Sequence, residues 1–165
     1  MVAMAEKLVS VQSSLELTVA DRIILEALKI RFENHLLPLA IAILDSGGNL
    51  VAFKREDGCG IMRHDIAIGK AWAALGMGMS TRQIRDRLAD RPTFQAALSS
   101  ASGGRFIPTP GGVLILNKQS IAIGAVGISG DASDKDEFCA IEAIRLSGLV
   151  SEPPVPEKNW KDNQL

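Results

Sequence analysis

Two apolar segments joined by a Gly-Gly turn constrain the fold of this chain more than any other feature. The first segment spans residues 39–45 and the second spans 49–55, with Gly47-Gly48 between them. This pattern predicts a β-hairpin, because apolar segments on both sides of such a turn pair as neighbouring strands. A second pair of strands is predicted at 113–116 and 120–129. Tight connections join antiparallel neighbours, so we expect an antiparallel sheet.

Helical spacing of apolar residues predicts helices before, between and after these hairpins. The first helix is expected to close at Asn34 and His35, and Pro92 fits the first turn of a later one. The order of helices and strands is typical of the α+β class. The expected helices cover about 18–34, 64–79, 81–89, 92–102 and a last segment that begins at Ser133.

The length of 165 residues favours a single domain, which we expect at 15–150. Residues 1–14 are interpreted as a loose N-terminal leader. Residues 151–165 contain three prolines and many polar residues, so they are interpreted as a C-terminal arm or a disordered tail.

The charge balance and the shortage of aromatic residues argue against one class of partner. The formal net charge is −1, and the chain has no Tyr, five Phe and two Trp. A nucleic-acid surface requires basic charge and usually stacking rings. We therefore expect no nucleic-acid partner.

The sequence also predicts a cytoplasmic protein without a membrane partner. The N-terminal residues lack the apolar core of a signal peptide, and the longest apolar stretch, 36–44, is too short to cross a bilayer. The two cysteines, Cys59 and Cys139, are too few for a disulfide framework, so we expect buried thiols.

Lys70 is a candidate catalytic residue, because helical spacing places it on one face with Ile66, Ala73 and Met77. A lysine on an apolar face must extend to solvent or form an ion pair. One interpretation is therefore a structural lysine. The other is an anion anchor or a proton-transfer group in a cleft.

Glycine and proline are densest at 103–112, which contains Arg105 and the turn Pro110-Gly111-Gly112. Backbone amides freed by Gly111 and Gly112, next to the fixed cation of Arg105, could bind a carboxylate. The alternative is a rigid turn that packs against another subunit. In the first interpretation, Arg105 and Lys70 face a shared hollow.

At the end of the first hairpin, alternation places Arg55 on the face of Val51 and Phe53, where it needs a carboxylate partner. Asp57 or a neighbouring subunit could supply that carboxylate. The other interpretation assigns Arg55 to ligand binding, with Asp57 as a candidate for moving a proton.

Acidic residues and histidines supply the remaining candidates. Asp136 and Glu137 lie in the first turns of the last predicted helix, where the helix dipole favours acids, and they are also candidate ligand-binding residues.

His35 and His64 are too far apart in the sequence to form a two-histidine site on one helix. His35, at a helix end, is the candidate metal ligand.

Several short segments follow one another in a defined order along about residues 15–150. They are Ala42-Ile43-Leu44-Asp45, Gly47-Gly48-Asn49-Leu50, 53–58, 66–71, 110–115, 123–130, Asp136-Glu137 and Ala140. No one of them is specific, but their order and spacing resemble the GlcG/HbpS-like family, which includes the C-terminal domain of the PduO cobalamin adenosyltransferase.

The resemblance implies a profilin-like fold, in which helices flank a five-stranded antiparallel sheet, and homo-oligomers from dimers to octamers. Some members of the family bind or degrade haem. Others accompany glycolate, diol or aromatic degradation, and some are credited with acting on muconate-type ring-cleavage products. Haem is therefore the cofactor hypothesis for this chain, with His35 as the candidate axial ligand, since imidazole is a natural ligand of haem iron.

Three hypotheses for function follow, and whether the protein is an enzyme stays open among them. The first is a protein of small-molecule or haem-associated metabolism that binds haem or a related ligand in an oligomer. The second is an enzyme acting on a small carboxylate by proton transfer or hydrolysis, in which Arg105 and Arg55 hold the acid and Lys70 or Asp57 moves the proton. The third is a non-catalytic oligomeric sensor or scaffold.

Overall fold

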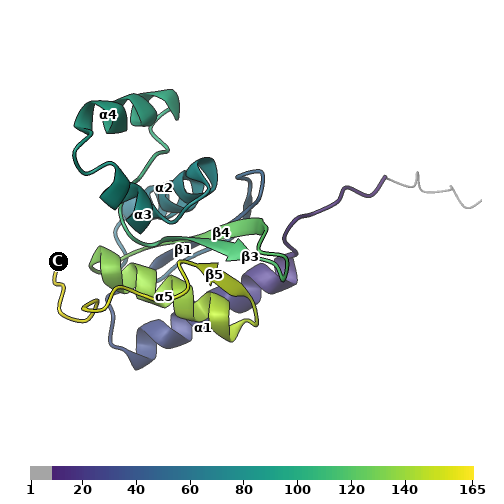
Figure 1. Cartoon of the computed structure of the whole chain (residues 1–165). Coiled ribbons are helices and arrows are strands. Elements are labelled where there is room, and N and C mark those ends of the chain that lie inside the picture. The colour runs from purple at the N-terminus through teal and green to yellow at the C-terminus, as the bar shows by residue number, and fades with distance from the viewer. Residues whose placement is uncertain (1–8) are drawn as a thin grey trace, which may run out of the picture.

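A five-stranded antiparallel sheet in the order β2-β1-β4-β3-β5 forms the middle layer of the molecule (Figure 1). The computed structural model describes residues 9–165. Both predicted hairpins are confirmed, because β1 pairs with β2 and β3 pairs with β4. The strands are β1 (Ala40–Asp45), β2 (Leu50–Arg55), β3 (Gly112–Leu116), β4 (Ala122–Ser129) and β5 (Val150–Glu152).

The fifth strand is the one element that the residue pattern did not indicate. β5 pairs with β3 and contains Ser151 and Glu152, the first two residues of the segment interpreted as an arm or tail. Three residues are too few to show the alternation of apolar and polar residues by which a strand is predicted from a sequence.

At the other end of the chain, residues 1–8 of the expected leader lie outside the described residues, and 9–16 form no helix or strand.

Helices cover both faces of the sheet (Figure 1). One face packs against α1 and α5, and the other packs against α2, with α3 and α4 beyond it. The helices lie close to their predicted positions, and the α+β class is confirmed. Their bounds are α1 (Leu17–Glu33), α2 (Met62–Met77), α3 (Thr81–Arg87), α4 (Pro92–Ala101) and α5 (Ser133–Leu146).

The two faces of the sheet are packed by side chains of different sizes. The face under α1 and α5 is filled by branched residues such as Ile23, Ile41 and Ile141. On the other face α2 presents small residues such as Ala71 and Ala74. Because these side chains are short, the backbone of α2 lies close to β4.

Gly127 on β4 marks the point of closest approach. A Cβ atom at this position would lie 1.8 Å from the backbone carbonyl oxygen of Ala67 on α2. Helix–sheet packing thus explains why a glycine occupies this position of β4. Both cysteines are buried free thiols, as expected. Within residues 9–165, no helix has the length and apolar character needed to cross a membrane.

The close approach of α2 predicts a strong effect of Gly127→Ala. The added methyl group would overlap a backbone atom that no side-chain rotation can move, so the free energy of unfolding should fall by about 3 kcal/mol. Gly60→Ala is the matched control, because a Cβ atom there meets nothing within 4 Å. Urea unfolding should show the control within about 0.5 kcal/mol of the original protein. Equal stability of the two variants would contradict this packing.

Candidate functional site

A buried ion pair between Lys70 and Asp136 joins the two helical layers across the end of the sheet. Lys70 extends from α2, and its Nζ donates hydrogen bonds to the carbonyl oxygen of Ile128 on β4 and to Oδ2 of Asp136 on α5, each at 2.9 Å. The other carboxylate oxygen of Asp136 accepts a hydrogen bond from the Asp131 amide at 3.0 Å. Lys70 is 2% exposed and Asp136 is fully buried.

The turn at Gly111 and Gly112 leaves room for this ion pair. Gly111 has a φ of +115°, and a Cβ atom on it would lie 2.9 Å from Lys70 Nζ. The amide of Gly112 donates to Thr81 Oγ1 at 2.8 Å. The turn therefore lies beside a cation and a carboxylate, but the cation is Lys70, not Arg105, and the carboxylate is the protein's own Asp136.

Burial controls the charge of this carboxylate. Removal from water raises the pKa of Asp136 to about 6, although the ammonium of Lys70 opposes the shift. The ammonium of Lys70 thus favours the ionised carboxylate, whereas burial favours the protonated form. A buried pair of this kind is costly to break, because either partner alone would be an uncompensated charge.

Glu137, the next residue on α5, has different partners. Its Oε2 lies 3.2 Å from Nε of Arg82 on α3, and among residues 9–165 no group donates a hydrogen bond to either of its buried carboxylate oxygens. Arg82 also binds Glu157 and the carbonyl oxygen of Val155, both in the C-terminal segment. Burial, only partly opposed by Arg82, raises the pKa of Glu137 to about 7.

Arg105 lies apart from Lys70. Its guanidinium carbon is 4.4 Å from the centroid of the Trp72 ring, and its Nε donates to the carbonyl oxygen of Ser102 at 3.0 Å. Residues 70 and 72 point to different sides of α2, since each residue turns a helix by about 100°. Arg105 is exposed whereas Lys70 is buried, so the two do not meet in an open hollow.

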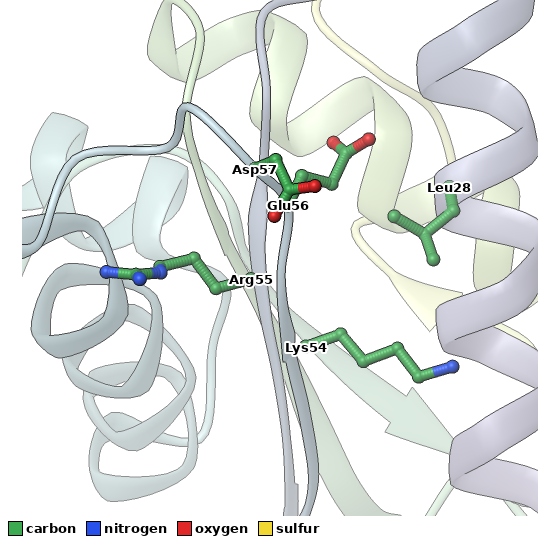
Figure 2. Close-up of a pocket in the computed structure, with 5 residues that line it drawn as sticks. All are labelled: Leu28, Lys54, Arg55, Glu56 and Asp57. Carbon is green, nitrogen blue, oxygen red and sulfur yellow. The ribbon is translucent and has the colours of Figure 1, made fainter.

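Arg55 and Asp57 lie at the end of β2, beside an open groove of about 510 Å³ (Figure 2). Figure 2 shows Lys54 extending toward α1 and Arg55 extending in the opposite direction. Both Arg55 and Asp57 are exposed, and within residues 9–165 they form no ion pair with each other. The expected pairing of Arg55 with Asp57 is therefore absent.

The residue between them, Glu56, has the structural role instead. Its Oε2 accepts a hydrogen bond from the Leu39 amide at 2.8 Å and lies 3.4 Å from Nε of Arg31 on α1. Glu56 thus ties the end of the first hairpin to α1. No sequence pattern distinguished Glu56 from its acidic neighbour Asp57.

His35 follows α1 in a left-handed backbone conformation, with a φ of +55°. The amides of His35 and Leu36 donate to the carbonyl oxygens of Phe32 and Arg31, at 3.3 and 3.0 Å. This pattern is a Schellman motif, in which glycine usually occupies the position of His35. The motif fixes the backbone that carries the imidazole, and His35 is exposed.

The surroundings of His35 differ from those of His64. His35 lines a hollow of about 270 Å³ with Asn34, Leu36, Lys135, Trp160 and Lys161. Both ring nitrogens of His64 already have partners, since Nδ1 lies 2.8 Å from the Ile61 carbonyl oxygen and Nε2 lies 3.0 Å from Asp65.

No group of three or more His, Cys, Asp or Glu gathers to hold a metal ion in the part of the chain that the structure describes.

Three residues near these sites were not predicted from the sequence. Thr81 binds the amide of Gly112, Arg82 faces the buried Glu137, and Trp72 stacks on Arg105. Trp72 could have been noticed, because it lies on α2 two positions from Lys70 and is one of only two tryptophans. Thr81 and Arg82 carry no such signal, since their partners are distant in the sequence.

Comparison with known proteins identifies the family. The sequence profile described as "Haem degrading protein HbpS-like" matches residues 15–145. The chain belongs to this HbpS-like family. An uncharacterized 15.0 kDa protein of Citrobacter freundii, from the dhaT-dhaS intergenic region, is 29% identical over 109 residues, which are 66% of this chain and 75% of that protein. The resemblance deduced from the sequence is thereby confirmed.

The corrinoid adenosyltransferase PduO of Citrobacter freundii is 26% identical over 114 residues. The matched region is 69% of this chain but only 33% of PduO, so the chain corresponds to about a third of that relative.

Solved structures of HbpS-like proteins share the fold. The crystal structure of a PduOC:heme complex has a TM-score of 0.75 and 23% identity, and the match covers 84% of this chain and 98% of that one. The ORFY protein of Klebsiella pneumoniae has a TM-score of 0.74 and 25% identity, with 88% and 98% covered. HbpS has a TM-score of 0.70 and 22% identity, also with 88% and 98% covered.

The buried ion pair predicts a large effect of Lys70→Met. This variant leaves the charge of Asp136 buried without its partner, so the free energy of unfolding should fall by about 3–5 kcal/mol in urea unfolding. Lys54→Met, an exposed lysine on β2, is the matched control and should change stability by less than about 0.5 kcal/mol. Adding Asp136→Asn to Lys70→Met should recover part of the loss. No recovery in the double variant would show that the charge is not the cause.

The raised pKa of Glu137 predicts a pH-dependent stability. Burial raises the pKa of the folded Glu137 carboxyl from its ordinary 4.5 to about 7, so the folded protein binds more protons than the unfolded chain between these values and loses stability as the pH rises through them. Glu137→Gln should remove the contribution of Glu137 and make the decline shallower, and the decline that remains belongs to Asp136, whose pKa burial raises to about 6. The exposed Glu33→Gln should leave the decline unchanged. Urea unfolding at several pH values measures how the free energy of unfolding changes with pH. If this pH dependence were the same in Glu137→Gln as in the original protein, Glu137 would not be the group responsible.

Proposed function

We propose that this protein binds haem in the hollow beside His35, with the imidazole of His35 as the iron ligand. The observation that carries the proposal is the combination of an exposed imidazole, two lysines and an indole around one hollow. The name of the family and the heme complex of PduOC, a protein of the same fold, support it.

The imidazole is available for coordination. Its ring forms no hydrogen bond or ion pair within residues 9–165, and the Schellman motif holds its backbone in place. The ring nitrogens of His64, in contrast, face Ile61 and Asp65. Of the two histidines, His35 therefore fits the role of axial ligand.

The other residues of the hollow suit the periphery of a haem, which has a flat apolar ring and two carboxylates. The ring of Trp160 stacks on Phe138 at 3.6 Å between centroids, and this packing fixes an apolar wall. Lys161 lies over the Trp160 ring, and Lys135 lies 3.5 Å from Asp131. Lys161 forms no ion pair within residues 9–165 and supplies positive charge for a carboxylate, whereas the charge of Lys135 is already paired with Asp131.

The hollow is smaller than a haem site, which points to an oligomer. Its volume of about 270 Å³ lies below the range of about 300–1,000 Å³ that is usual for ligand pockets. The adjacent face of α1 exposes Leu25 and Phe32, and Phe32 is 74% exposed. A second copy of the chain on this face would cover both the apolar side chains and the open side of the ligand.

A hemin titration followed by absorbance in the Soret region tests the assignment. His35→Ala should weaken binding by about tenfold or more, because the ligand of the iron is lost. His64→Ala is the matched control and should bind as the original protein does. Loss of binding in His64→Ala alone would overturn the proposal.

The variant His35→Gly distinguishes loss of the iron ligand from loss of folding stability. Glycine adopts the left-handed conformation freely, so this variant should unfold at the same or a higher urea concentration, with a gain of up to about 1 kcal/mol. It should nevertheless bind hemin as weakly as His35→Ala. Hemin binding at the original affinity in His35→Gly would show that the imidazole is not the ligand.

A further inference from the structure

We infer that the outer side of α2 carries a second site, which binds a small aromatic carboxylate between Trp72 and Phe106. This site shares no residue with the hollow at His35, and its ligand belongs to a different chemical class.

The apolar part of the site is a pocket of about 170 Å³ between α2 and the segment that follows α4. A comparable apolar cavity of about 150 Å³ holds a benzene ring. The pocket is too small for a porphyrin, and its wall offers little polar surface to a sugar or a phosphate. The side chains that define it are Trp72 and Met77 of α2, Leu98 of α4 and Phe106.

A guanidinium group contacts one of the side chains that line this pocket. Arg105 is placed between Ser102 and Phe106, which both line the pocket, and its side chain stacks on Trp72, which lines it from α2. Its Nε binds the Ser102 carbonyl oxygen, whereas its two terminal nitrogens donate no hydrogen bond within residues 9–165. Nor does any carboxylate of these residues form an ion pair with it. The free edge of a guanidinium matches a carboxylate with two parallel hydrogen bonds.

The segment that carries Arg105 is held in place before any ligand arrives. Ser102 Oγ accepts a hydrogen bond from the Phe106 amide at 3.0 Å and donates to the Ser99 carbonyl oxygen at 2.8 Å. On α2, a Cβ atom at Gly69 would lie 2.4 Å from the side chain of Ile107, so this glycine lets the segment lie directly on the helix. Such preorganisation reduces the entropy lost on binding.

Together these features select the ligand. An aromatic ring fills the pocket beside Trp72 and Phe106, and a carboxylate attached to the ring reaches the guanidinium of Arg105. Neither part suffices alone, because a short aliphatic acid leaves the pocket empty and an uncharged aromatic leaves Arg105 without a partner.

Benzoate is the probe, with benzamide and acetate as the uncharged and ring-free comparisons. Isothermal titration calorimetry of the full chain should show benzoate binding at least about tenfold more tightly than either comparison. Saturation-transfer NMR should report contact with the ring protons of benzoate. Absence of benzoate binding at millimolar concentration, or equal affinity for acetate, would overturn the inference.

Three variants locate the site. Arg105→Gln should weaken benzoate to the level of benzamide, whereas Arg91→Gln should have no effect, although Arg91 also stacks on an exposed ring, Phe94, at 4.7 Å. Ala101→Phe, at an exposed residue that lines the pocket, should block benzoate and benzamide alike. Unchanged benzoate binding in Arg105→Gln or in Ala101→Phe would overturn the inference.

The benzoate site can be tested independently of the haem proposal. His35→Gly should bind benzoate as the original protein does, so failure of the haem proposal would not affect this test.

Discussion

The ion pair between Lys70 and Asp136 is the interaction on which the arrangement of layers depends. It links α2 on one face of the sheet with α5 on the other, and it also holds the carbonyl group of Ile128 at the end of β4. A charged pair without water is tolerated only when each charged group has further hydrogen-bond partners. The glycine at position 111 follows from this requirement, since a side chain there would occupy the space of the ammonium.

The same ion pair explains why α2 has two different sides. The side toward the sheet carries small residues and Lys70, and the backbone of Ala67 nearly touches β4 at Gly127. The outer side carries Trp72, which contacts Arg105 and also packs against the edge of the core cluster around Leu44 and Ala71. The two ligand sites that we propose therefore lie on the outside of α2 and at the end of α1, away from the buried ion pair.

The sequence predicted those parts of the structure that depend on local patterns. The two hairpins follow from apolar segments around turns, and the antiparallel sheet follows from the hairpins. Lys70 was recognised because helical spacing placed a charge among apolar residues. Its partner could not be identified, because Asp136 lies 66 positions away and its location in the first turns of a helix has a sufficient local explanation.

Contacts between distant segments account for what the sequence did not predict. Arg105, beside the Gly111-Gly112 turn, was expected to face a shared hollow with Lys70, which lies on the apolar face of α2. The exposed side chain of Arg105 instead extends to the Trp72 side of that helix. The three-residue strand β5 forms only because β3 offers a free edge to it. The partner of Glu137 is Arg82, on a short helix whose place depends on the path of the whole chain.

The position of α4 has a consequence for motion. None of its residues is buried, and Figure 1 shows it as the helix farthest from the sheet. Helices with little buried surface open at a lower free energy than the core does, so amide protons of α4 should exchange with deuterium long before those of α2. The wall that Leu98 contributes to the pocket therefore belongs to a part of the fold that opens at a lower free energy than α2, which carries Trp72.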